Sequence, residues 1–256
     1  MEFVAGKGNG GGVITVLMKK SYLESPLSRT PSLIQNESAE RKEPVMIPDN
    51  FEFGLDDMMV PLHYRDSLEN IMIPHGLVQD RIDKLAHDIR KTYSNITVHM
   101  LCVLKGGSIF FSDLLRALRT FHDFNDQSYV PFTFDFIRVK SYEGTESTGN
   151  VQISGGDVSR LQGRHVLLVE DIIDTGLTMQ KLVPAMKAHG LASVRVASLL
   201  EKRTERSCGF KADFVGFSIP DKFVVGYCMD YNEWYRDLRH IAVINQAGIE
   251  KFKDEL

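Results

Sequence analysis

Hydrophobic residues recur at helical spacing in two stretches of the chain. At residues 77–93 and 108–121 they lie three or four positions apart, so each stretch predicts an amphipathic helix with one buried face. In the second stretch that face consists of Phe110, Phe111, Leu114, Leu115 and Leu118. A third helix is predicted at residues 177–188. It is expected to end at His189-Gly190, because glycine after the last helical residue is a stop signal.

Short apolar runs, typical of strands, lie between and after these helices. The run Val166-Leu167-Leu168-Val169 contains no polar residue, as expected for a strand buried on both faces of a parallel sheet. Further strands are predicted at residues 98–104, 130–139, 150–154, 193–200, 214–219, 224–229 and 240–244. The alternation predicts an α/β fold, a mainly parallel twisted sheet with helices on both faces. The strands at 130–139 and 150–154 are expected to form an added hairpin.

The first 48 residues follow neither pattern. They hold Gly10-Gly11-Gly12, several serines and four prolines. Such a segment cannot bury enough apolar surface to offset the entropy of ordering. Residues 1–48 are therefore predicted to be a disordered N-terminal extension, and residues 49–256 one folded domain.

Composition narrows the class of protein. The chain has 256 residues, of which 43% are hydrophobic, and a formal net charge of -4. The negative charge argues against nucleic acid as a partner. No apolar run approaches the roughly 18 residues of a membrane span, so no membrane is expected either. Cys102, Cys208 and Cys228 form no C-x-x-C pair and are interpreted as free thiols in a reducing compartment.

Three short motifs are typical of secreted proteins. The chain ends in Lys253-Asp254-Glu255-Leu256, which matches the ER-retention signal, and Asn36-Glu37-Ser38 and Asn95-Ile96-Thr97 match the glycosylation pattern. All three matter only if the chain enters the ER, which normally needs a positive start and an apolar core of about 7–15 residues. The chain begins Met1-Glu2-Phe3-Val4 and has only a short apolar run at residues 13–18. We interpret the matches as accidental and expect a cytoplasmic protein.

Polar clusters directly follow three predicted strands. They are Lys105-Gly106-Gly107, Glu170-Asp171 and Glu201-Lys202-Arg203. Ligands of parallel α/β sheets bind at the carboxyl ends of the strands. The order of elements therefore predicts that these clusters meet at one edge of the sheet and form a binding site.

The most informative run is the ten residues from Val169 to Thr178. Two acids end a strand, and Asp174-Thr175-Gly176-Leu177-Thr178 then opens a helix, whose unpaired N–H groups and positive dipole end suit a monophosphate. Alone, Asp174 or Thr175 could simply cap the helix, and the two acids could be a solvated strand end. A nucleotide hydrolase is disfavoured, because the chain contains no G-x-x-x-x-G-K-[ST] loop.

This run resembles the phosphoribosyl-diphosphate signature of type I phosphoribosyltransferases, and other motifs resemble their hypoxanthine-guanine group. These motifs occur in family order between about Pro61 and Ile244: Ile73-Pro74-His75-Gly76, Leu104-Lys105-Gly106-Gly107, Phe136-Ile137-Arg138-Val139-Lys140-Ser141-Tyr142, Val196-Ala197-Ser198-Leu199-Leu200, and the nine residues from Ile219 to Tyr227. The resemblance implies the type I phosphoribosyltransferase fold over residues 49–256, with a small hood and a hairpin lid. It also implies purine salvage, in which phosphoribosyl diphosphate and hypoxanthine or guanine give IMP or GMP and diphosphate.

The resemblance implies a role for each matching position. Asp174 would be the catalytic base that takes the proton from purine N7, and the loop would hold the 5′-phosphate while Glu170 and Asp171 bind the ribose hydroxyls. Lys105, at what resembles a non-proline cis peptide of the family, would face the diphosphate together with Arg236. The full implied substrate-binding set is Lys105, Gly106, Glu170, Asp171, Ile172, Ile173, Asp174, Thr175, Gly176, Leu177, Thr178, Lys202, Lys222, Phe223, Val224, Asp230 and Arg236. Leu177 stands where relatives often carry a basic residue, so phosphate binding is expected to be somewhat weaker.

The implied base site and metal site lie later in the chain. Lys202 would donate to the purine O6, since an ammonium prefers a carbonyl to the amino group of adenine, and Phe223 would stack on the base. Alone, Lys202 would be a surface lysine and Phe223 a core residue. Asp230 would help hold Mg²⁺, with Glu170 and Asp171 acting through water.

The segment at residues 141–149 is polar and lies between two strands. It resembles the family's mobile lid, for which Ser141 and Tyr142 are the candidate residues, although its composition fits an ordinary hairpin loop equally well. The resemblance also implies a homo-dimer or homo-tetramer. The alternative function is a non-catalytic, nucleotide-binding relative of these enzymes. The preference among hypoxanthine, guanine and xanthine stays open, as does the role of residues 1–48.

Overall fold

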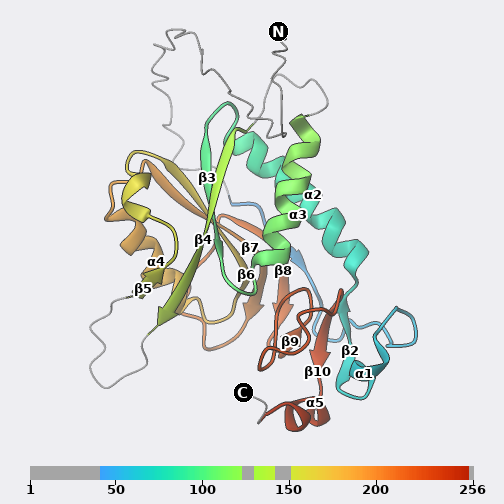
Figure 1. Cartoon of the computed structure of the whole chain (residues 1–256). Coiled ribbons are helices and arrows are strands. Elements are labelled where there is room, and N and C mark those ends of the chain that lie inside the picture. The colour runs from blue at the N-terminus through green and yellow to red at the C-terminus, as the bar shows by residue number, and fades with distance from the viewer. Residues whose placement is uncertain (1–40, 123–129, 142–150, 254–256) are drawn as a thin grey trace, which may run out of the picture. The chain divides into compact units, whose positions relative to one another are not determined.

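A seven-stranded sheet forms the centre of the protein in the computed structural model, which describes residues 41–122, 130–141 and 151–253 (Figure 1). Its strand order is β1-β8-β7-β6-β3-β4-β5, parallel from β1 to β4 and antiparallel between β4 and β5. The strands are β1 Val45–Met46, β3 Val98–Val103, β4 Phe132–Ser141, β5 Val151–Ser154, β6 His165–Ile173, β7 Ser193–Arg203 and β8 Phe214–Pro220. The mainly parallel sheet and the added hairpin confirm the predicted fold class.

Both faces of this sheet are buried. Helices α2 (His75–Thr92) and α3 (Ser108–His122) cover one face, and α4 (Leu177–Lys187) covers the other, while η1 (Val158–Leu161) leads from β5 to β6 (Figure 1). Along β3, Met100 and Cys102 belong to the core under α2 and α3, whereas Leu101 and Val103 belong to the core under α4. This period of two explains the continuous apolar runs, because each successive side chain enters a different core.

A second, three-stranded antiparallel sheet forms the predicted hood. Its order is β2 (Leu68–Ile73), β10 (Ile241–Ile244) and β9 (Val224–Val225), and the short helices α1 (Leu62–Arg65) and α5 (Gln246–Lys251) accompany it. In Figure 1 it lies below β8 at the lower edge, where the parallel strands end. The hood therefore stands beside the carboxyl ends of the sheet.

Three predicted boundaries were wrong. β6 runs on to Ile173 and β7 to Arg203, because Ile173 still pairs with Glu201 and Arg203 with Pro220; the acids and Lys202 lie inside strands. The strand predicted at 224–229 stops at Val225, and the chain turns at Gly226 with φ +91. The elements β2, α1 and α5 were not predicted at all.

The predicted start of the folded domain also needs correction. Val45–Met46 forms the edge strand β1 on β8, and Ile47 is only 3% exposed. Arg203 donates to the Ile47 carbonyl at 2.8 Å, so this segment is bonded to the sheet before residue 49. A two-residue strand is too short to show a period in the sequence. Residues 1–40 of the predicted extension lie outside the described residues.

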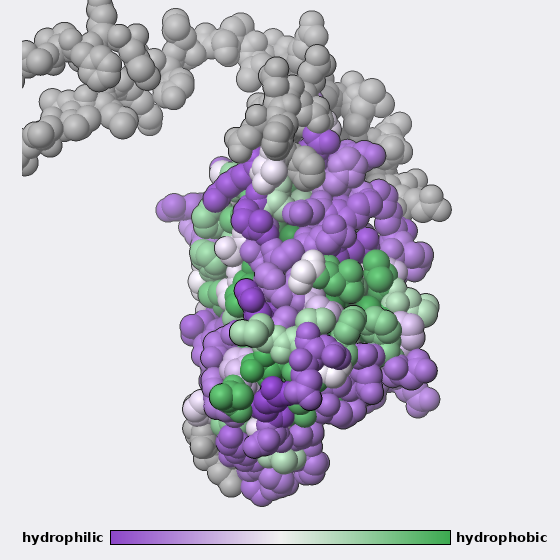
Figure 2. Space-filling view, turned by 90° about the vertical axis from the view of Figure 1, so that its right-hand side faces the viewer, coloured by the Kyte–Doolittle hydropathy of each residue, from purple (hydrophilic) through white to green (hydrophobic). Residues whose placement is uncertain are grey.

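The surface seen in Figure 2 is mostly hydrophilic, with smaller hydrophobic patches between the polar side chains. Among the residues that the structure describes, the most exposed large hydrophobic ones are Met59 and Leu62, at 80% and 82%. Among the described helices, none combines the length and apolar character needed to cross a bilayer.

Candidate active site

The loop after β6 forms a cradle at the N-terminus of α4. Gly176 is the N-cap residue with φ +84, and the N–H of Leu177 donates to Thr175 Oγ1 at 3.4 Å, so the side chain that contacts the start of the helix is that of Thr175 and not that of Asp174. A Cβ at Gly176 would lie 2.9 Å from Phe210 Cβ and 3.0 Å from Cys208 Sγ, and the N–H of Cys208 donates to the Thr175 carbonyl at 2.8 Å. Glycine is therefore required by both conformation and space. The N–H groups that follow Leu177 in the first turn of α4 can bind an anion.

Two neighbouring pockets open at this loop. One is lined by Glu170, Ile172, Ile173, Asp174, Thr175, Gly176, Thr178 and Met179. The other is lined by Asp171, Ile172, Asp174, Lys202, Phe223, Val224, Met229 and Asp230. Ile172 and Asp174 belong to both, so a ligand can extend from the anion cradle into the second pocket.

Asp174 and Lys202 meet where the pockets join. Lys202 on β7 is 9% exposed, and its Nζ donates to Asp174 Oδ2 at 3.2 Å. Asp174 Oδ1 is buried and has no hydrogen-bond partner among the described residues; Arg206 Nη2 lies 3.7 Å away. A carboxylate with a free oxygen beside a fixed ammonium can accept a proton from one ring atom while the ammonium binds a neighbouring carbonyl.

Phe223 lies at the open side of the second pocket. Its side chain is 49% exposed, and its ring meets Tyr231 edge-on at 5.6 Å. The exposed ring face can stack on a planar ligand, whereas Val224, 6% exposed, lies in the wall.

The two acids of β6 line different pockets: Asp171 lines the second one, and Glu170 lines the first. Burial and the adjacent Asp171 carboxylate raise the pKa of Glu170 well above its usual value. Burial, with a contribution from the Asp230 charge, also raises the pKa of Asp171. Glu170 Oε2 is buried and has no hydrogen-bond donor among the described residues. Hydrogen-bond donors of a ligand, or a cation bound with it, would therefore stabilise the two carboxylates.

Gly106 allows the loop after β3 to approach Asp171 closely. The Leu104–Lys105 peptide is cis, which agrees with the expectation from the family resemblance. A Cβ on Gly106 would lie only 1.7 Å from Asp171 Oδ2. No side chain fits at this position unless the carboxylate moves.

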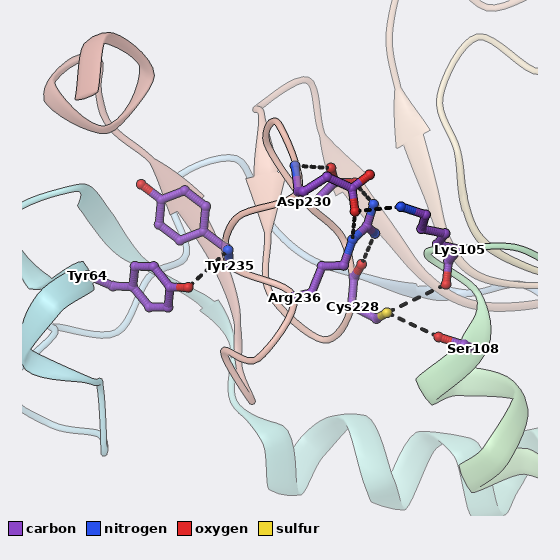
Figure 3. Close-up of polar contacts among 8 residues, drawn as sticks. Tyr64, Lys105, Ser108, Cys228, Asp230, Tyr235 and Arg236 are labelled. Atoms are coloured by element: carbon purple, nitrogen blue, oxygen red, sulfur yellow. Dashed lines mark hydrogen bonds and ion pairs between the residues drawn. The ribbon is translucent and has the colours of Figure 1, made fainter. Parts of the chain in front are cut away.

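The basic residues at this edge belong to one polar network (Figure 3). Lys105 Nζ and Arg236 Nε both contact Glu233 Oε2, at 2.8 and 3.1 Å, and Arg236 Nη2 lies 2.9 Å from Asp230 Oδ1. The Cys228 thiol donates to the Lys105 carbonyl at 3.5 Å, and Arg236 Nη1 donates to the Cys228 carbonyl at 2.7 Å. The hydrogen bond with Arg236, and to a smaller extent the one with Lys105, lowers the pKa of Glu233 to about 2. The two cations therefore stand close together.

The carboxylates fit a magnesium ion held mainly by substrate. No group of three His, Cys, Asp or Glu side chains with metal-binding geometry occurs in the described part of the chain. Mg²⁺ commonly uses one or two protein carboxylates together with substrate phosphates and water. Asp171 and Asp230 repel each other electrostatically, and Glu170 has a free oxygen, so a cation between them would be stabilised.

Some candidate residues lie apart from the pockets. The side chain of Lys222 pairs with Glu69 at 3.2 Å and lines neither pocket. Leu177 is 50% exposed on the first turn of α4. Ser141 ends β4, and Tyr142 with the rest of the predicted lid lies outside the described residues, as do the last three residues of the Lys253–Leu256 match.

Comparisons with known proteins agree with this geometry. The phosphoribosyl transferase domain family matches residues 73–232. The hypoxanthine-guanine phosphoribosyltransferase of Bos taurus is 54% identical over 182 residues, which is 71% of this chain and 83% of the relative, and that of Homo sapiens is 53% identical over the same shares. The chain belongs to the hypoxanthine-guanine phosphoribosyltransferase family. A hypoxanthine-guanine phosphoribosyltransferase structure from Schistosoma mansoni, in complex with IMP, has a TM-score of 0.69 and 35% identity; the match covers 82% of this chain and all of that one.

Three neighbours of the site were not predicted from the sequence. Met229 lines the second pocket, Arg206 approaches Asp174, and Glu233 joins Lys105 to Arg236. Arg206 follows the predicted polar cluster Glu201-Lys202-Arg203 by only three residues. This proximity in the sequence was the one signal that it lies near the site. Nothing local in the sequence distinguishes Glu233 from a solvated acid.

Glu170→Gln is expected to make the ligand-free enzyme more stable and less active. A raised pKa in the folded state means that Glu170 favours folding at low pH, and that this contribution is lost as the pH rises through the folded pKa. The amide removes the buried charge beside Asp171, so Tm at neutral pH should rise by roughly 2–4 °C for each kcal/mol of repulsion removed. Calorimetry from pH 4 to 8 without Mg²⁺ should show this gain shrinking toward pH 4. A lower Tm at neutral pH would contradict the prediction. The value of kcat/KM should fall, because the family resemblance implies that Glu170 binds a ribose hydroxyl.

Proposed function

We propose that this protein transfers the 5-phosphoribosyl group from phosphoribosyl diphosphate to hypoxanthine or guanine, giving IMP or GMP and diphosphate. The observation that carries the proposal is the contact between Asp174 and Lys202 at the junction of the anion cradle and the pocket with Phe223. The IMP complex of the Schistosoma mansoni relative supports the same product class.

The charged residues of the site suggest a role for each in the transfer reaction. The bond from ribose C1′ to the diphosphate oxygen breaks, the bond from C1′ to the purine nitrogen forms, and Asp174 takes the proton that the base loses at N7. Lys202 donates to O6, which favours a 6-oxopurine over adenine. Backbone N–H groups of the α4 cradle hold the 5′-phosphate, and Glu170 and Asp171 accept hydrogen bonds from the ribose hydroxyls. Lys105 and Arg236 face the negative charge of the diphosphate.

Magnesium is part of the proposal. Asp230 would hold it with substrate oxygens, and Glu170 and Asp171 would act through water. When bound, the ion neutralises part of the charge of the diphosphate group.

One assay tests the reaction. The purified protein is mixed with Mg²⁺, phosphoribosyl diphosphate and one of hypoxanthine, guanine, xanthine or adenine, and the release of diphosphate is measured. We expect release with hypoxanthine or guanine and none with adenine. Binding of GMP with no turnover for any base would favour the non-catalytic alternative.

Two further properties are proposed from the family resemblance and the sequence. We expect a homo-dimer or homo-tetramer, which sedimentation equilibrium would test. We expect a cytoplasmic location; imaging the protein with its own C-terminus free would overturn this if the ER were stained.

A further inference from the structure

Glu233 occupies the space between two cations that the proposed function assigns to diphosphate. A single carboxylate oxygen, Oε2, accepts from Lys105 Nζ at 2.8 Å and from Arg236 Nε at 3.1 Å. These two residues are far apart in the sequence: Lys105 follows β3 of the central sheet, and Arg236 lies between β9 and β10 of the hood (Figure 3). An oxygen anion held by an ammonium and a guanidinium has the same surroundings as an oxygen of a bound diphosphate.

The backbone at Glu233 is unfavourable for a residue with a side chain. Asn232 and Glu233 have φ +47 and +70, and Tyr231 and Trp234 exchange hydrogen bonds at 3.0 and 3.3 Å across them. This is the pattern of a two-residue turn with both central residues left-handed, in which glycine is strongly preferred at the second position. Glu233 stands there instead, and its carboxylate contacts Lys105 and Arg236.

The carboxylate is fixed in place and still open to solvent. The Glu233 N–H donates to Asp230 Oδ2 at 2.8 Å, which anchors the turn. The side chains of Lys105 and Glu233 are 49% and 42% exposed, and that of Arg236 is 22% exposed. An incoming anion can therefore reach both cations. Arg236 keeps Asp230 and the Cys228 carbonyl as partners when Glu233 leaves.

We propose that Glu233 is an internal competitor of diphosphate: in the free enzyme it holds Lys105 and Arg236 in place, and the diphosphate group must displace it to bind. The inference rests on the proposed function in one respect, which is that the anion that displaces Glu233 is diphosphate. Glu233 is thus a positioning residue that weakens diphosphate binding and so speeds its release.

Isothermal titration calorimetry with the full chain tests this directly. Magnesium diphosphate and, separately, GMP are titrated into wild type, Glu233→Gln, Glu233→Gly and the control Glu250→Gln. Glu250 is an exposed acid on α5 that pairs with Lys253 at 2.7 Å, outside the site. We expect both Glu233 variants to bind diphosphate about 3- to 20-fold more tightly, the combined strength of two exposed ion pairs. The Glu233 variants should bind GMP with the affinity of wild type. Glu250→Gln should bind both diphosphate and GMP with the affinity of wild type.

The two Glu233 variants separate charge from backbone effects. Glycine relaxes the left-handed turn and glutamine does not. If Glu233 had a purely structural role, the two substitutions would therefore change diphosphate affinity in different ways. Equal tightening in both supports competition. Unchanged or weaker diphosphate binding in Glu233→Gln, or no diphosphate binding by any form, overturns the inference. If wild type makes nucleotide but the variants bind diphosphate no more tightly, only the inference fails. If the variants tighten but wild type makes no nucleotide, only the proposed function fails.

Discussion

Asp174→Asn should lower kcat by about 10²–10⁴-fold, the usual contribution of a general base. The amide has the same shape, and it can keep the contact that Lys202 Nζ makes with Asp174 Oδ2 at 3.2 Å. It cannot accept the proton that the purine loses. Steady-state rates with guanine and phosphoribosyl diphosphate measure the effect, and thermal unfolding confirms that the fold is retained.

Asp221→Asn is the matched control for this change. Asp221 is a carboxylate beside the same Arg206, at 3.4 Å, but it lines neither pocket. Its amide variant should keep nearly wild-type turnover. If Asp174→Asn retained wild-type turnover as well, Asp174 would not be the base.

Gly106→Ala should reduce both activity and stability. The new Cβ would lie 1.7 Å from Asp171 Oδ2, so either the loop after β3 or the acid must move. Such overpacking typically destabilises a protein by about 1–3 kcal/mol. A shift of about 1 Å at Asp171 or Lys105 can lower kcat/KM by about 10²-fold. Chemical denaturation and initial rates measure the two effects.

Gly76→Ala separates this clash from a general effect of replacing glycine. A Cβ at Gly76 would meet nothing within 4 Å, and the residue lies in the first turn of α2. Alanine there should keep the activity and should leave stability unchanged or raise it by up to about 1 kcal/mol. Equal losses in the two variants would show that the contact between Gly106 and Asp171 is not the cause.

Much of the central sheet could be predicted, because its signal is local. The apolar runs of β3 and β6 and the helical spacing of α2 and α3 depend only on which neighbours are hydrophobic. The hood was anticipated from the family resemblance alone. Its strand β2 carries Glu69 and Asn70 within Leu68–Ile73, so it is recognised as a strand only once it pairs with β10.

The sequence by itself determined the parallel sheet and the order in which polar clusters reach its edge. It also contained the run from Glu170 to Thr178, whose resemblance to the family signature implies a phosphate-binding loop and a general base. Short-range patterns carry this information, since burial repeats with the period of a strand or helix. Only the tertiary structure decided that Glu233 lies between Lys105 and Arg236, that Gly106 touches Asp171, and that β1 extends the sheet. These contacts join residues distant in the chain, and their distances depend on how the elements dock, which no local pattern records.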